Sequence, residues 1–137
     1  MTRDADKATD WLAARAGALP VVEWSVREGH EPRGLYVEQF WLPVIGPSAL
    51  LAWWRMLSIV DMGAMSGTTI DCVDLAWQLG LGRSAGKNAP ITRTLARLCR
   101  YEFATIDHEC YAVRTLAPKL SRTLVARNRD RREGRML

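Results

Sequence analysis

The order of hydrophobic and polar residues along the first half of the chain predicts two helices and one strand. Apolar residues at helical spacing predict a short amphipathic helix over 4–17. Strict alternation over 22–26 predicts a half-buried strand, and a Gly- and Pro-containing loop follows over 29–34. Residues 47–62 are apolar on most sides, and a proline suits the first turn of this segment. They therefore predict a helix at the centre of the core.

The next segment predicts a short strand over 68–70 and a helix over 72–79. Asp71 is suited to cap the start of this helix, and Gly80 to end it. The apolar stripe of the helix is expected to hold Val73, Ala76 and Trp77.

A glycine-rich basic turn over 81–87 precedes the last regular elements. A helix is expected over 90–101, with Pro90 in its first turn. Two strands, 103–106 and 111–115, flank a tight loop over 107–110, and Pro118 is expected to open a final helix.

Residues 47–115 thus run helix, strand, helix, turn, helix, strand, loop, strand, which is the order of a winged helix-turn-helix. We therefore predict a mainly α fold with a small β-hairpin, in which this domain spans residues 36–127. An N-terminal helix and strand extension, 1–35, is expected to pack on the core. A disordered basic tail is expected over 128–137.

Composition agrees with a single globular domain, because 48% of the 137 residues are hydrophobic and 25% are charged. No run is long and apolar enough for a membrane span, and no signal sequence is visible, so we expect a cytoplasmic protein. Cys72, Cys99 and Cys110 form no Cys-x-x-Cys pair, which argues against disulfides or a zinc site. No metal or other cofactor is expected.

The charge of the chain is divided between its two halves. Residues 1–76 carry 6 Lys and Arg against 10 Asp and Glu, a balance of −4, whereas residues 77–137 carry 13 against 5, a balance of +8. A basic surface attracts polyanions, which indicates a nucleic-acid partner. Sixteen of the basic residues are Arg. This bias suits phosphate and base contacts, but the codon usage of a GC-rich genome explains it equally well.

The helix expected over 90–101 has two contrasting faces. On a helical wheel, Arg93, Arg97 and Arg100 lie within about 60° of one another. They lie opposite an aliphatic face with Ile91 and Leu95. An arginine-bearing face is ordinary for a surface helix, but no acidic residue lies near these three at helical spacing. Because the guanidinium fork matches guanine and phosphate, we expect this helix to enter the DNA major groove.

Other residues near this helix complete the expected DNA contact. Thr92, Thr94 and Ala96 are small enough for close approach to a groove, and Asn88 either caps the helix or contacts adenine. Arg83, Lys87 and Arg114 are expected at phosphates, with His108 at the tip of the hairpin. The predicted DNA-binding residues are Arg83, Lys87, Asn88, Thr92, Arg93, Arg97, Arg100, His108 and Arg114.

No catalytic set is evident, and we do not expect an enzyme. Residues 80–88 are similar to a nucleotide-binding P-loop, but this motif requires glycine where Leu81 stands and a hydroxyl where Asn88 stands. His30 and His108 have no nucleophile motif near them.

Six short strings in the second part of the chain are distinctive: FWLPVIGP at Phe40, LGLG at Leu79, NAP at Asn88, LARL at Leu95, YAVR at Tyr111 and PKLSR at Pro118. Together they resemble a family of small, largely uncharacterised bacterial winged helix-turn-helix proteins. This resemblance covers residues 36–127 and implies the fold without supplying an activity or site residues. The stretch LPVIGPSALL from Leu42 is also similar to the winged-helix opening of Gram-positive primosomal replication-initiation proteins.

The expected function is DNA binding by a transcriptional or accessory regulator. A homodimer is expected because one such motif has a small footprint. The alternative is a protein-interaction subunit or adaptor that binds a partner through the Trp-rich region 36–62. Exposure of Trp41, Trp53 or Trp54 would favour this alternative. RNA binding is a weaker third alternative, since no aromatic platform on a sheet is expected.

Overall fold

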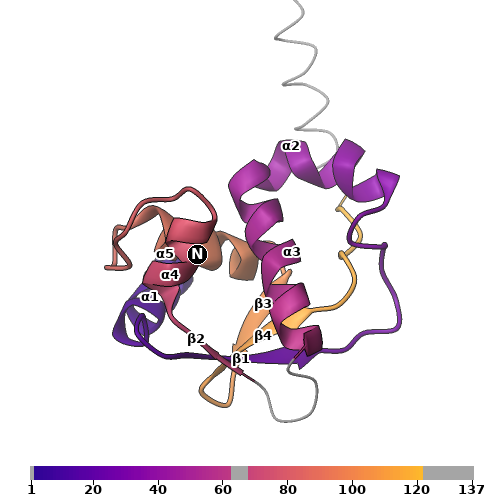
Figure 1. The fold of residues 1–137 in the computed structure, drawn as a ribbon. Helices are drawn as coiled ribbons and strands as arrows, with labels where there is room; N and C mark the ends of the chain where they lie inside the picture. Colours follow the sequence, from indigo (N-terminus) through magenta and orange to yellow (C-terminus); the bar gives the residue numbers. More distant parts are fainter. Residues whose placement is uncertain (1, 63–67, 122–137) are drawn as a thin grey trace, which may run out of the picture.

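The computed structural model describes residues 2–62 and 68–121 (Figure 1). The basic tail expected over 128–137 and most of the helix expected from Pro118 lie outside the described residues. Within them, residues 118–121 are not helical. The elements in chain order are α1 (Thr2–Ala14), β1 (Leu19–Trp24), the π-helical turn η1 (Val37–Trp41), α2 (Leu42–Ile45), α3 (Pro47–Met62), β2 (Thr68–Ile70), α4 (Cys72–Gln78), α5 (Pro90–Arg100), β3 (Ala104–Asp107) and β4 (Cys110–Arg114).

The strands of the described residues form one sheet in the order β2-β1-β4-β3. β1 pairs antiparallel with β2 and parallel with β4, where Val21 lies opposite Tyr111. The expected mainly α fold with a small hairpin is therefore corrected to a mixed α/β fold. Alternating residues predict that a strand exists, but they carry no information about which distant strand it pairs with.

β1 begins at Leu19, before the residues whose alternation indicates it. Leu19 and Val21 are fully buried, whereas Val22 and Trp24, on the face expected to be buried, are only half-buried. The strand has neighbours on both edges, so the segment that carries it is part of the sheet.

The core forms around α3, as the sequence predicts. α3 begins at Pro47, directly after Gly46, whose φ of +84° ends α2. Trp53 is fully buried on α3, its Nε1 donates to the backbone oxygen of Arg114 at 2.9 Å, and its ring meets Phe103 edge-on at 4.8 Å. α3 therefore packs against β1, β4 and Phe103, which directly precedes β3 (Figure 1).

α4 is confirmed at both ends, but of its expected apolar stripe only Ala76 is buried. The Asp71 carboxylate accepts from the backbone N of Val73 at 2.9 Å, and Gly80 follows the helix with a φ of +73°. Val73 and Trp77 are exposed, whereas Cys72, Leu75 and Ala76 are buried. A helix of two turns has too few residues for its periodicity to specify the buried face, which packing against α5 decides here.

The hairpin between β3 and β4 is confirmed. Asp107 pairs with Cys110 across a two-residue turn, in which His108 and Glu109 have φ values of 49° and 64°. Positive φ at both central residues is the pattern of a type I′ turn, whose twist matches that of the strands.

No single helix within residues 2–62 and 68–121 combines the length and apolar character that crossing a membrane requires. The segment η1–α2 and the helix α3 together have that length and apolar character, but a bend of 116° separates them.

Candidate nucleic-acid interface

α5 starts without the side-chain cap expected from Asn88. Its N-cap is Ala89, which forms no side-chain cap, and Asn88 is exposed. The hydroxyl of Thr92 instead donates to the backbone oxygen of Gly86 at 2.6 Å, which holds the preceding turn against the helix. Pro90 occupies the first turn as predicted. The capping role of Asn88 is therefore wrong, and its amide faces solvent.

α5 is buried on most of its circumference. Ile91, Leu95 and Leu98 face the core, and α1, α3 and α4 all pack against the helix. Thr92 is only 3% exposed, so the prediction that it contacts DNA is wrong. Thr94 and Ala96, expected to approach a groove, are buried as well. The sequence wheel misses this because it does not include α1, which comes from the far end of the chain.

Beyond Pro90, the exposed residues of α5 are Arg93, Arg97 and Arg100, which we call the arginine ridge. Nη1 of Arg97 donates to the backbone oxygen of Ile45 at 3.2 Å, so the ridge borders the junction of α2 and α3. The guanidinium of Arg100 lies 5.5 Å from the ring centre of Tyr101. None of the three pairs with a carboxylate in the part of the chain that the structure describes.

The turn before α5 holds the two other basic residues expected at this end of the helix. The guanidinium of Arg83 lies 4.3 Å from the ring centre of Trp77, which is 59% exposed. Nζ of Lys87 lies 3.0 Å from the Asp10 carboxylate of α1, with both side chains more than half exposed. The structure therefore adds Trp77 and Asp10 to the surroundings of the predicted site. The sequence predicts Trp77 in the apolar stripe of its helix and contains no signal that links Asp10 to this turn.

This turn is longer than in most helix-turn-helix motifs. The residues between α4 and α5 are 79–89, whereas such motifs usually connect their helices with about three or four residues. The backbone N of Leu81 donates to the oxygen of Ala76 at 2.8 Å, and that of Gly80 donates to the oxygen of Trp77 at 3.2 Å. These two bonds form a Schellman motif, which fixes the direction in which the chain leaves α4.

The tip of the β3–β4 hairpin is exposed but carries negative charge. The His108 side chain is 93% exposed, and its Nε2 lies 3.4 Å from the Asp107 carboxylate. Glu109 pairs with Arg15 at the end of α1. Carboxylates repel phosphate groups, so the surroundings of His108 are less favourable for a backbone contact than its sequence position indicates.

Arg114 has a structural role that the sequence does not reveal. Its guanidinium donates to the backbone oxygens of Leu116 at 2.9 Å and Glu28 at 3.2 Å, and it lies 5.3 Å from the ring centre of Trp24. Two of the five N–H groups of this guanidinium are thus used by the fold. The expected phosphate contact of Arg114 stays a prediction.

Cys72 is buried and Cys99 half-buried, and both lie near the hydroxyl of Tyr111. Burial raises the pKa of the Cys72 thiol to about 11, with the charge of Asp71 adding to the effect, and burial raises that of Cys99 to about 11. Tyr111 donates to the backbone oxygen of Leu95 at 2.8 Å, and burial raises its pKa well above the usual value. Both thiols therefore stay protonated at neutral pH. The described residues contain no group of three or more His, Cys, Asp or Glu that is arranged to hold a metal ion.

Comparisons with protein-family models, with curated proteins and with solved structures find no match to this chain. The resemblances noted from the short sequence strings therefore stay predictions.

Proposed function

We propose that this protein binds double-stranded DNA by placing the arginine ridge of α5 in the major groove, and that it acts as a small transcriptional or accessory regulator. The observation that carries the proposal is the ridge itself. Arg93, Arg97 and Arg100 are the exposed side chains along the body of a helix whose other sides are buried. Each guanidinium can form two parallel hydrogen bonds with guanine or a phosphate.

The element order from α3 to β4 supports the same proposal. Helix, strand, two helices and a hairpin follow one another as in a winged helix-turn-helix, with α5 as the helix that enters the groove. The long turn over 79–89 and the acidic hairpin tip depart from this arrangement. We therefore assign the main contact to α5 and a lesser one to the hairpin.

Side chains next to the ridge extend the proposed contact. Arg83 and Lys87 are exposed in the turn before α5 and would bind phosphates. Asn88, which does not cap the helix, is exposed at the same end and has the amide that adenine recognition uses. We propose Arg83, Lys87 and Asn88 as the N-terminal part of the interface. A homodimer would double a footprint that is small for one copy.

The proposal is tested by fluorescence anisotropy with random duplex DNA at several salt concentrations. The wild type is compared with Arg93→Ala/Arg97→Ala/Arg100→Ala and with the charge-matched control Lys7→Ala/Arg27→Ala/Lys119→Ala, which changes three exposed residues elsewhere. Each lost phosphate contact should reduce the slope of log K against log salt by about 0.9. We expect a shallower slope for the ridge variant alone. Equal effects of both variants, or no binding by the wild type at low salt, would reject the proposal.

One observation favours the alternative of a protein-interaction subunit, but at a different surface. Trp41 and Trp53 are buried and Trp54 is half-buried, so none of the three tryptophans named for this alternative is fully exposed. Trp77 and Val73 are exposed one turn apart on α4, which makes this helix the better candidate for a protein contact. Sedimentation of the wild type and of Trp77→Gln tests it, because a complex or dimer formed through α4 should dissociate in the variant. The expected cytoplasmic location stays a prediction.

A further inference from the structure

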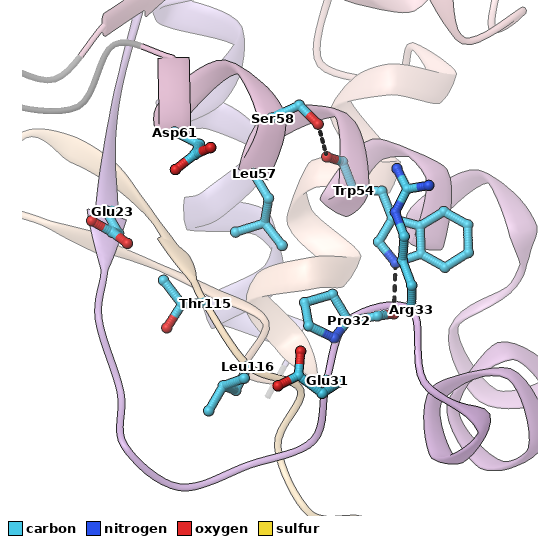
Figure 2. A pocket seen from close by; sticks show the side chains of 10 residues that line it. All are labelled: Glu23, Glu31, Pro32, Arg33, Trp54, Leu57, Ser58, Asp61, Thr115 and Leu116. Carbon is cyan, nitrogen blue, oxygen red and sulfur yellow. Dashed lines mark hydrogen bonds between the residues drawn. The ribbon is translucent and has the colours of Figure 1, made fainter.

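A pocket of about 450 Å³ lies against α3. This volume falls within the range of roughly 300 to 1,000 Å³ that is usual for small-molecule sites. Its walls are α3, the loop that contains Pro32, and the chain after β4 (Figure 2). Its lining includes Glu23, Arg33, Trp54, Leu57, Asp61 and Leu116.

The walls of the pocket are held in place by hydrogen bonds. Backbone bonds of 2.9 and 2.8 Å join His30 and Ala117, so the loop is fixed to the chain after β4. On the other side, Nε1 of Trp54 donates to the backbone oxygen of Pro32 at 2.7 Å (Figure 2). These contacts tie the loop to α3 and to the segment after β4. The pocket is therefore formed before any ligand arrives.

The pocket has an apolar floor. Trp54, Leu57 and Leu116 are half-buried, so each presents part of its side chain to the space between the walls. Along α3, Trp54, Leu57 and Asp61 follow one another at helical spacing on one face, which spans about 10 Å. A ligand lying along this face would cover apolar surface over most of its length.

The two ends of the pocket differ in charge. Glu23 and Asp61 lie on the side away from Trp54 and Arg33, with Leu57 between the two groups (Figure 2). The guanidinium of Arg33 lies 5.0 Å from the ring centre of Trp54, so that end carries a positive charge. Neither Glu23 nor Asp61 forms an ion pair with another described residue. The charge at their end of the pocket is therefore −2.

We propose that this pocket binds a small organic amine with an apolar chain. Its ammonium group would pair with Glu23 and Asp61, and its chain would lie over Leu57 and Leu116 toward Trp54. A bare metal ion fits less well, because these carboxylates belong to no group of three described residues that could hold one. A carboxylate ligand is disfavoured by the charge at the acidic end. This proposal does not depend on DNA binding.

The test is isothermal titration calorimetry of the full chain with n-hexylamine, 1-hexanol and hexanoate, which share one carbon chain and differ in the head group. We expect one saturable site for n-hexylamine, with an affinity at least about tenfold above that for 1-hexanol, equal to about 1.4 kcal/mol. Methylamine, which has the charge without the chain, should bind at least about tenfold more weakly than n-hexylamine.

Two pairs of variants locate the site. Glu23→Gln/Asp61→Asn should weaken n-hexylamine binding about tenfold, whereas the charge-matched control Glu38→Gln/Glu102→Gln should change it less than about twofold. All four residues are exposed, so the variants should fold, which thermal unfolding checks. The proposal is overturned if n-hexylamine shows no saturable binding, if methylamine binds equally well, or if both pairs of variants have the same effect.

Discussion

Asp10 of α1 and Lys87 of the turn before α5 form an ion pair with 3.0 Å between their charged atoms. The pair places a carboxylate next to a residue that we propose at a phosphate. Binding of DNA through Lys87 would therefore compete with Asp10.

Replacing Asp10 with Asn should raise the affinity for duplex DNA. An exposed ion pair contributes about 0.2 to 1 kcal/mol, so the gain should be about 1.5- to 5-fold at low salt. Anisotropy measures it, with Glu38→Gln as a control that removes the same charge from η1. An equal gain in the control would mean that only net charge matters.

Arg97 and Arg93 should differ in their effect on stability, although both belong to the arginine ridge. The guanidinium of Arg97 donates to the backbone oxygen of Ile45. The guanidinium of Arg93 forms no hydrogen bond with the other residues that the structure describes. Arg97→Ala should lower the free energy of unfolding by about 0.5 to 1.5 kcal/mol. Arg93→Ala should change it by less than about 0.5 kcal/mol. Urea denaturation compares the two, and equal losses would contradict the contact with Ile45.

The buried thiols should make the protein less stable at alkaline pH. The pKa values of Cys72 and Cys99 rise from 9.0 to about 11 on folding, so the folded state keeps protons that the unfolded state loses. Their contribution is present below pH 9.0 and is lost as the pH rises toward about 11. Urea denaturation between these values should show a steeper loss for the wild type than for Cys72→Ala/Cys99→Ala. Parallel curves would exclude this contribution.

Gly29 should not tolerate a side chain. Its φ is +146°, and a Cβ there would lie 2.6 Å from the backbone oxygen of Ala117. Gly29→Ala should therefore lower the free energy of unfolding by about 1 to 3 kcal/mol. Gly17→Ala, where a Cβ has open space around it, is the control and should be close to neutral. Urea denaturation distinguishes them, and a neutral Gly29→Ala would show that the loop can move away from Ala117.

The elements that the sequence predicts well are those whose signals are local. Pro47 marks the start of α3, Asp71 caps α4, and the turn at His108 and Glu109 joins two strands with alternating residues. In each case, residues close in sequence determine the conformation.

The features that the sequence does not predict depend on distant contacts. Thr92 has the size expected of a groove-facing residue, but α5 is enclosed by other helices and this side chain is buried. Arg114 has the charge of a phosphate contact, but the oxygens of Glu28 and Leu116 hold it. The exposure of candidate residues is predictable where several of them share one face of a helix, as in the arginine ridge. It is less predictable for single residues in turns and strands.

The parallel pairing of β1 with β4 has a consequence for the order in which the molecule folds. β1 lies near the start of the described chain and β4 near its end, and the residues between them supply α3, α4 and α5. During synthesis, β1 can therefore pair with β4 only after the residues between the two strands have been made. Contacts of such large sequence separation slow folding, because a long loop must close first. We expect the pairing of β1 with β4 to be the late, slow event in folding, after α3 has packed against its neighbouring helices.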